Sequence, residues 1–172
     1  MSIFAVVALV ASGAPAGLMH PLDPAIDGQL QCYHPDDIKR TCRSIAAYQR
    51  KADGTYANTA TVLISSKGPV TLETLTPVTV KAGAVCGSIR AEDISKGKLR
   101  VANRLLSDSE AAPILVRIAQ AMNAMTNKQI CTSYEQSPTG IMARVTIDGV
   151  FRPDADQSVK WVRATEGYTV SP

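Results

Sequence analysis

The sequence predicts an α+β fold, in which a mainly antiparallel β-sheet of short strands and hairpins packs against one amphipathic helix at about residues 113–126. Three observations predict this class. Short stretches with alternating apolar residues recur at spacings of roughly 8–12 residues. Two Asp-Gly pairs, at 53–54 and 148–149, have the composition of tight hairpin turns. The apolar period changes to that of a helix once, after Pro113.

The composition fits one domain with its own core, because the chain has 172 residues of which 45% are apolar. Its 18 basic and 15 acidic residues are interspersed and give a formal net charge of +3. A nucleic-acid-binding surface needs a dense basic stripe, so no nucleic-acid partner is predicted. The nearest candidate is broken by apolar residues and is typical of the solvated side of a strand. It comprises Lys39, Arg40, Arg43, Arg50 and Lys51.

The first residues have the pattern of a secretory signal peptide. Residues 3–10 are unbroken apolar sequence, and small residues follow up to Ala16, where cleavage is predicted. An uncleaved membrane anchor and a buried first strand are the two alternatives for this segment. The predicted organisation is a signal peptide at 1–16, a tether at 17–30 that Pro and Gly punctuate, and a single disulfide-bonded domain at 31–172.

The four cysteines agree with export. An even number of cysteines in an oxidising compartment usually means disulfides, and four allow three pairings. We predict Cys32–Cys42, which closes a short loop, and Cys86–Cys131, which ties a strand to the segment after the helix. A zinc site built on Cys32, His34 and Cys42 is the alternative, but its spacing matches no C-x2-C pattern, and no metal is predicted. The predicted location is periplasmic or secreted, with no transmembrane span in the mature chain.

The first hairpin is predicted from Asp53-Gly54, which suits the two-residue loop of a type I′ turn. This turn places Ala47 opposite Ala60 and Ile45 opposite Val62, so that the apolar residues share one face. The other face is then the wetter one. It carries Ser44, Tyr48, Thr59 and Thr61.

Later strands are predicted at 70–75, 85–90, 130–134, 141–147 and 159–163, and Pro77 places its strand at an edge or a bend. The helix is predicted from the stripe Ile114, Leu115, Ile118, Met122 and Met125. Pro113 suits its first turn, and Ser107 to Glu110 has capping-box spacing just before it. The two methionines are interpreted as core packing against the sheet, with an adaptable binding surface as the alternative.

Three segments carry a resemblance. They are the Cys-x9-Cys spacing of Cys32 and Cys42, residues 43–48 running into Asp53-Gly54-Thr55-Tyr56, and Gly83-Ala84-Val85-Cys86-Gly87. In these segments the chain resembles small exported four-cysteine proteins of Gram-negative bacteria, a group with no assigned function. The resemblance covers most of residues 31–172 and implies export, but it supplies no active site.

No local motif predicts chemistry. G-x-S-x-G, P-loop and H-E-x-x-H patterns are missing from the sequence, and no cofactor is predicted. The predicted function is therefore an exported binding or structural module that acts on an envelope component or a protein partner. Two alternatives stay open, an enzyme with a site assembled from scattered residues and an inhibitor of a secreted hydrolase.

The candidate binding surface is the loop that the Cys32–Cys42 disulfide would constrain, because a pre-ordered loop loses less freedom on binding. His34 beside two carboxylates could form a His–carboxylate dyad, but a turn cluster after Pro35 is the interpretation we favour, and no catalytic residue is predicted. The candidate binding residues are Tyr33, His34, Asp36, Asp37 and Arg40.

Overall fold

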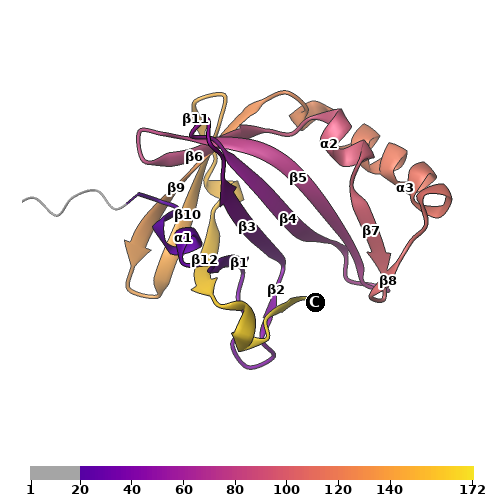
Figure 1. Cartoon of the computed structure of the whole chain (residues 1–172), viewed down its shortest axis with the longest axis horizontal. Coiled ribbons are helices and arrows are strands. Elements are labelled where there is room, and N and C mark those ends of the chain that lie inside the picture. The colour runs from indigo at the N-terminus through magenta and orange to yellow at the C-terminus, as the bar shows by residue number, and fades with distance from the viewer. Residues whose placement is uncertain (1–19) are drawn as a thin grey trace, which may run out of the picture.

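The structure, a computed structural model, describes residues 20–172 and is built around a closed antiparallel β-barrel of eight strands (Figure 1). Around the barrel the strands run in the order β4, β3, β1, β12, β10, β9, β6 and β5, and pairing of β5 with β4 closes the ring. Their bounds are β1 Leu30–Tyr33, β3 Ser44–Arg50, β4 Tyr56–Ser65, β5 Val70–Lys81, β6 Ala84–Ser88, β9 Gln129–Ser137, β10 Gly140–Ile147 and β12 Gln157–Val162.

The predicted fold class, an α+β sheet of hairpins with one helix packed on it, is therefore wrong. Most of the strands were correctly expected, but the sheet closes on itself and the helix lies beside a short extension of it. Closure needs pairings between distant segments, such as β1 with β12 and β6 with β9. Alternation along one strand shows that one face is buried, but does not distinguish an open sheet from a barrel.

Five short strands lie outside the ring. Strands β7 and β8 extend the sheet from β5, and β11 pairs with β10. Strands β2 and β13 form a separate parallel pair. One edge of β5 is shared by β7 and β6, and its ladder with these two strands is interrupted between Glu73 and Val78, where Pro77 lies. Proline has no N–H to donate, so it is accommodated in that gap. The bounds are β2 Thr41–Cys42, β7 Lys98–Val101, β8 Arg104–Leu105, β11 Val150–Phe151 and β13 Thr169–Val170.

The main helix, α3, spans Asp108–Ala121 and begins earlier than the predicted residue 113. The predicted capping box supplies its start, because the Ser107 N–H donates to the Glu110 carboxylate at 2.8 Å. Pro113 lies inside the helix rather than in its first turn. The helix packs on the β5–β7 extension through Ala111 and Leu115. The remaining helical segments are α1 Asp23–Ile26, α2 Ala91–Ser95, and the single turns η1 Asn123–Met125, η2 Pro153–Ala155 and η3 Ala164–Glu166.

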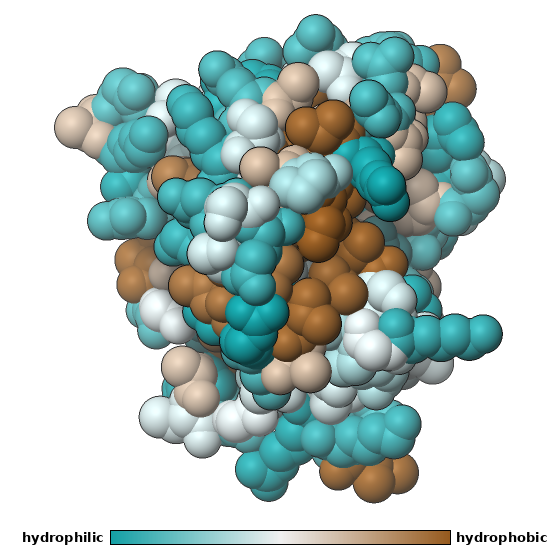
Figure 2. Space-filling model, turned by 90° about the vertical axis from the view of Figure 1, so that its right-hand side faces the viewer, coloured by the Kyte–Doolittle hydropathy of each residue, from teal (hydrophilic) through white to brown (hydrophobic). Residues whose placement is uncertain are grey.

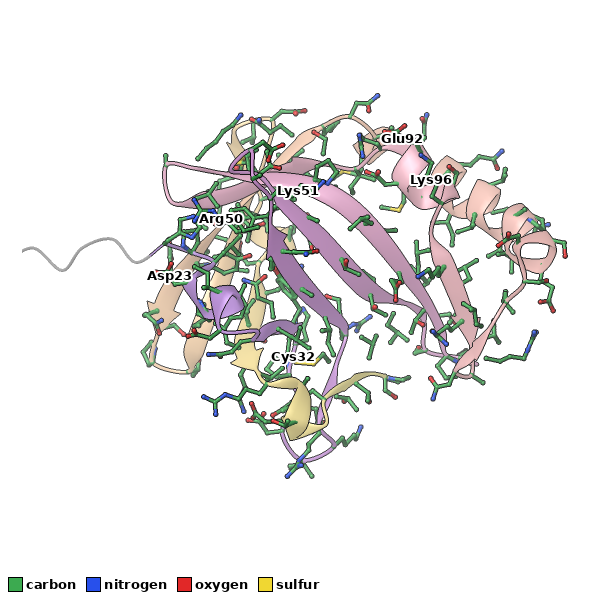
Figure 3. The ribbon with its side chains drawn as sticks, in the orientation of Figure 1. Asp23, Cys32, Arg50, Lys51, Glu92 and Lys96 are labelled. Carbon is green, nitrogen blue, oxygen red and sulfur yellow. A yellow bond between two sulfur atoms is a disulfide. The ribbon has the colours of Figure 1, made fainter. Side chains whose placement is uncertain are left out.

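The described part of the predicted tether closes one end of the barrel. Leu22 is fully buried and packs with Tyr56, Val78 and Val85. Helix α1 follows it, with Asp23 in its first turn, on the side of the molecule away from α2 and α3 (Figures 1 and 3). The predicted signal peptide and residues 17–19 lie outside the described residues.

The first hairpin has a different register from the predicted one. Ala46 faces Ala60 and Ser44 faces Val62. The Lys51 N–H donates to the Thr55 carbonyl at 2.8 Å, so the loop has three residues instead of two. Of the Asp53-Gly54 pair, Gly54 has a positive φ of +82°, while the Asp53 carboxylate accepts the Thr55 N–H at 2.9 Å. This local bond favours the longer loop. The shift by one residue inverts the faces of β3, so its inward residues are Ser44, Ala46 and Tyr48.

Both predicted disulfides are confirmed. Cys32 in β1 is bonded to Cys42 in β2, with Cα atoms 5.4 Å apart. Cys86 in β6 is bonded to Cys131 in β9. The two residues are direct partners on neighbouring strands of the barrel wall, with Cα atoms 4.1 Å apart. Two disulfides indicate an oxidising environment. Among the described residues, no helix combines the length and apolar character that crossing a membrane requires.

Candidate functional site

The barrel encloses a cavity of about 300 Å³. This volume is at the lower end of the range of small-molecule sites, and eight strands give a lumen that either fills with side chains or holds one small ligand. The walls come from residues of six strands together with Ile89, α2 and Met122. They are Tyr33, Tyr48, Asn58, Ala60, Val62, Ile64, Leu72, Thr74, Thr76, Val78, Val85, Gly87, Ser88, Ile89, Asp93, Ile94, Met122, Ile130, Thr132 and Tyr134.

The inner part of this cavity has a polar cluster on its wall, which we call the tyrosine cluster. The hydroxyls of Tyr48, Tyr33 and Tyr134 lie 2.7, 2.9 and 3.1 Å from the Oε1 atom of Gln31. Gln31 is fully buried on β1, while the tyrosines come from β1, β3 and β9. The cluster therefore joins opposite walls of the barrel through one amide oxygen.

The hydroxyls of Tyr33 and Tyr48 stay neutral over the physiological pH range. Burial raises the pKa of Tyr33 well above its usual value, and the neighbouring tyrosines add to this effect. Burial likewise raises the pKa of Tyr48. These groups can therefore donate or accept hydrogen bonds, but they do not supply a charge.

Two side-chain atoms near the cluster are buried and have no hydrogen-bond partner among residues 20–172. They are Nε2 of Gln31 and Oδ1 of Asn58. Asn58 lines the cavity and is the direct cross-strand partner of Tyr48. Buried polar atoms are nearly always paired, so an unpaired acceptor on a cavity wall is a candidate contact for a ligand.

The opposite end of the cavity, the open end, reaches solvent. Val62 and Ile64 line the cavity and are 38% and 44% exposed. Met122, at the C-terminal end of α3, lines the same cavity. Figure 2 faces this side of the molecule and shows apolar side chains gathered in its centre, with hydrophilic side chains around them.

One carboxylate belongs to the cavity wall in the described part of the chain. Asp93 on α2 is 7% exposed, and both of its oxygens accept hydrogen bonds from the Arg90 guanidinium, one of them at 2.9 Å. Glu92 on α2 and Lys96, the residue that follows α2, are exposed and are labelled in Figure 3. The bidentate pair compensates the charge of Asp93 within the protein. Residues 20–172 contain no cluster of three or more His, Cys, Asp or Glu side chains placed to hold a metal ion.

The residues of the sequence-derived binding surface do not lie together. Tyr33 points into the barrel, whereas His34, Asp37 and Arg40 are exposed on the loop between β1 and β2. The Arg40 guanidinium donates to the Glu166 carbonyl at 3.1 Å, and the Asp36 carboxylate accepts the Lys39 N–H at 2.9 Å. These contacts give the loop a local structural role. Whether it also binds a partner stays a prediction.

Asp37 connects this loop to the C-terminal part of the chain. Its carboxylate accepts hydrogen bonds from the Tyr168 hydroxyl and from the Lys160 ammonium, the latter at 2.9 Å. These two bonds lower the pKa of Asp37 below its usual value. The arrangement fixes the loop against β12 on the outside of the barrel.

Sequence reasoning missed the cavity because its residues are scattered over six strands. Tyr48 was assigned to the wetter face by the incorrect hairpin register. Gln31 and Asn58 carry no local signal, because one amide side chain in a strand is common. A correct register for every strand would have placed all three tyrosines on one inner surface.

Comparisons with protein-family models, with curated proteins and with solved structures find no match to this chain.

Proposed function

We propose that this protein is an exported binding module whose barrel takes up one small, largely apolar molecule. The observation that carries the proposal is a cavity of about 300 Å³ that is closed at one end and open at the other. Most of its wall surface is apolar, and the tyrosine cluster together with Asn58 supplies polar groups at depth, which is the usual composition of a small-molecule site. An envelope component of this size and polarity is the kind of ligand that fits an exported module.

The closed end supports this proposal because it gives the cavity a rigid inner boundary. Leu22 and Tyr56 fill the lumen there, and Tyr48, Tyr134 and Trp161 pack against them. A molecule entering at Val62 and Ile64 would leave water on apolar surface and would meet fixed side chains. Pre-ordered walls reduce the entropy that binding costs.

A neutral apolar dye tests the proposal. N-phenyl-1-naphthylamine fluoresces strongly in apolar surroundings, so we expect its emission to rise when it is mixed with the protein. Thr74→Phe, on an inward residue of β5, fills the cavity and should abolish the increase.

The matched control is Thr59→Phe. Thr59 is exposed on the outer side of β4, one residue from Ala60, the partner of Thr74. The Thr59→Phe variant should bind the dye as well as the unchanged protein does. The proposal is wrong if the unchanged protein leaves the emission unaltered, or if a folded Thr74→Phe variant binds as well as the control.

Export to the periplasm or beyond is the second part of the proposal. It is supported by the two disulfides and by the signal-peptide pattern of residues 1–16. The intact mass of protein isolated from cells should equal that of residues 17–172. Recovery of the complete chain from the cytoplasm, with free thiols, would contradict this part alone.

A further inference from the structure

The polarity of the cavity changes along its length, and strands β4 and β5 show the change most clearly. Their inward residues pair as Asn58 with Thr76, then Ala60 with Thr74, then Val62 with Leu72. The first pair lies beside the tyrosine cluster, because Asn58 is also the partner of Tyr48. The last pair is at the open end. Along these two strands the lumen is therefore polar at depth and apolar near solvent, so an amphiphile matches their gradient with its head inside and its chain toward the open end.

In the described part of the chain, two unpaired polar atoms lie near the deep end, the donor Nε2 of Gln31 and the acceptor Oδ1 of Asn58, and of these two residues Asn58 is the one that lines the cavity. Oδ1 of Asn58 is buried and has no donor among the described residues. The tyrosine hydroxyls lie within hydrogen-bond distance of Gln31, and when they donate to its Oε1 atom their own oxygens stay free to accept. A head group that donates a hydrogen bond would satisfy Asn58. An aliphatic end would leave its carbonyl oxygen buried and unpaired, which is unfavourable.

A charged head has no counterion at this depth. The described residues of the cavity wall include no Lys, Arg or His, and the Asp93 carboxylate is already paired with Arg90. Burying a carboxylate or an ammonium group without an opposite charge costs far more than burying a neutral hydroxyl. The head group must then be uncharged.

We propose that the ligand is an uncharged amphiphile with a hydroxyl or amide head, which binds head first so that the head meets Asn58 beside the tyrosine cluster and the apolar chain occupies the open end. This inference rests on the proposed function, because it assigns a ligand class to the same cavity.

The test is displacement of N-phenyl-1-naphthylamine from the full chain by compounds with the same chain and different heads. We expect decanol and decanamide to compete at least tenfold better than decanoate and decylammonium at neutral pH. The reason is that each of the last two would bury a charge without a counterion. Decane, which has no head, should also compete more weakly than decanol.

Asn58→Leu separates the head contact from simple apolar fit. The substitution removes the acceptor and keeps a side chain of similar size. The affinity for decanol should therefore fall roughly tenfold, to that for decane, and the affinity for decane should be unchanged. Asn123→Leu, on an exposed residue of η1, is the matched control and should keep the preference for decanol. If Asn58→Leu does not fold, competition by the four compounds with different heads on the unchanged protein still tests whether the bound head is uncharged.

Two results would overturn the inference. One is decanoate competing as well as decanol, which would mean that the head stays outside the barrel. The other is a preference for decanol that survives in a folded Asn58→Leu variant. Both leave the proposed function intact, whereas failure of the dye to bind at all would remove the proposed function together with this inference.

Discussion

The two ends of the barrel lumen differ although the same strands build both. At the closed end, Tyr56 of β4 packs with fully buried Leu22. Eight residues further along β4, Ile64 also points inward but is 44% exposed. The difference comes from what lies opposite each residue. The segment before β1 reaches back into one end, and the other end is left open between β4, α2 and Met122. The cavity thus exists because one end of the lumen is filled by this segment and the other end is not filled.

Removing the disulfide in the barrel wall should have the largest effect. Changing Cys86 and Cys131 to alanine opens a loop with a sequence separation of 45 residues, against 10 for Cys32 and Cys42. The chain-entropy relation gives losses of about 4 and about 2.7 kcal/mol, respectively. Urea unfolding of both double variants measures the difference. Equal losses, or a larger loss for the Cys32–Cys42 pair, would show that loop length does not govern these bonds.

Truncating one side chain at each end of the lumen should cost different amounts of stability. Leu22→Ala removes a fully buried side chain and should cost about 3 kcal/mol, within the usual range for buried leucine. Val62→Ala, at the open end, should cost about 1 kcal/mol or less, because Val62 is 38% exposed. Urea midpoints with unchanged slopes would measure both. A cost for Val62→Ala that matches that of Leu22→Ala would mean that the open end is packed in solution.

The smallest effect concerns the helix beside the open end. The Arg104 guanidinium, followed by the bonds from Ser107, lowers the pKa of Glu110 from 4.5 to about 2. Because the folded pKa is the lower one, Glu110 contributes stability above pH 4.5, and this contribution is lost as the pH falls from 4.5 toward 2. Glu110→Gln should therefore lower the Tm at pH 7 and have little effect near pH 2. An equal Tm difference at both pH values would rule out this contribution.

The two Asp-Gly turns show how far the sequence predicts this fold. At 148–149 both residues have positive φ and Ile147 faces Val150, so the prediction of a two-residue turn is confirmed. At 53–54 the same dipeptide forms a longer loop, because Asp53 bonds to Thr55. Local chemistry beyond the dipeptide therefore decided the register, and the register decided which face of β3 lines the cavity.

The disulfide pairs and most strands were predictable because they depend on short segments. Strand β10 alternates cleanly, and Cys131 follows the helix closely. The barrel and the tyrosine cluster depend instead on how distant strands pair. Gln31 and Tyr134 are separated by 103 residues, and no pattern within either strand indicates that their side chains meet. Burial of Leu22 was also missed, because the proline and glycine around it are typical of a linker.

Methyl NMR tests most directly whether the lumen is closed at one end and takes up a small molecule at the other. With labelled Ile, Leu and Val methyl groups, titration with decanol should shift the resonances of Val62, Ile64 and Leu72 together, at one saturable site. The resonances of Leu22, at the closed end, and of Leu75, exposed on the outside of β5, should stay in place. Shifts at Leu75 with none at Val62 and Leu72 would show that the molecule binds outside the barrel and not in its lumen.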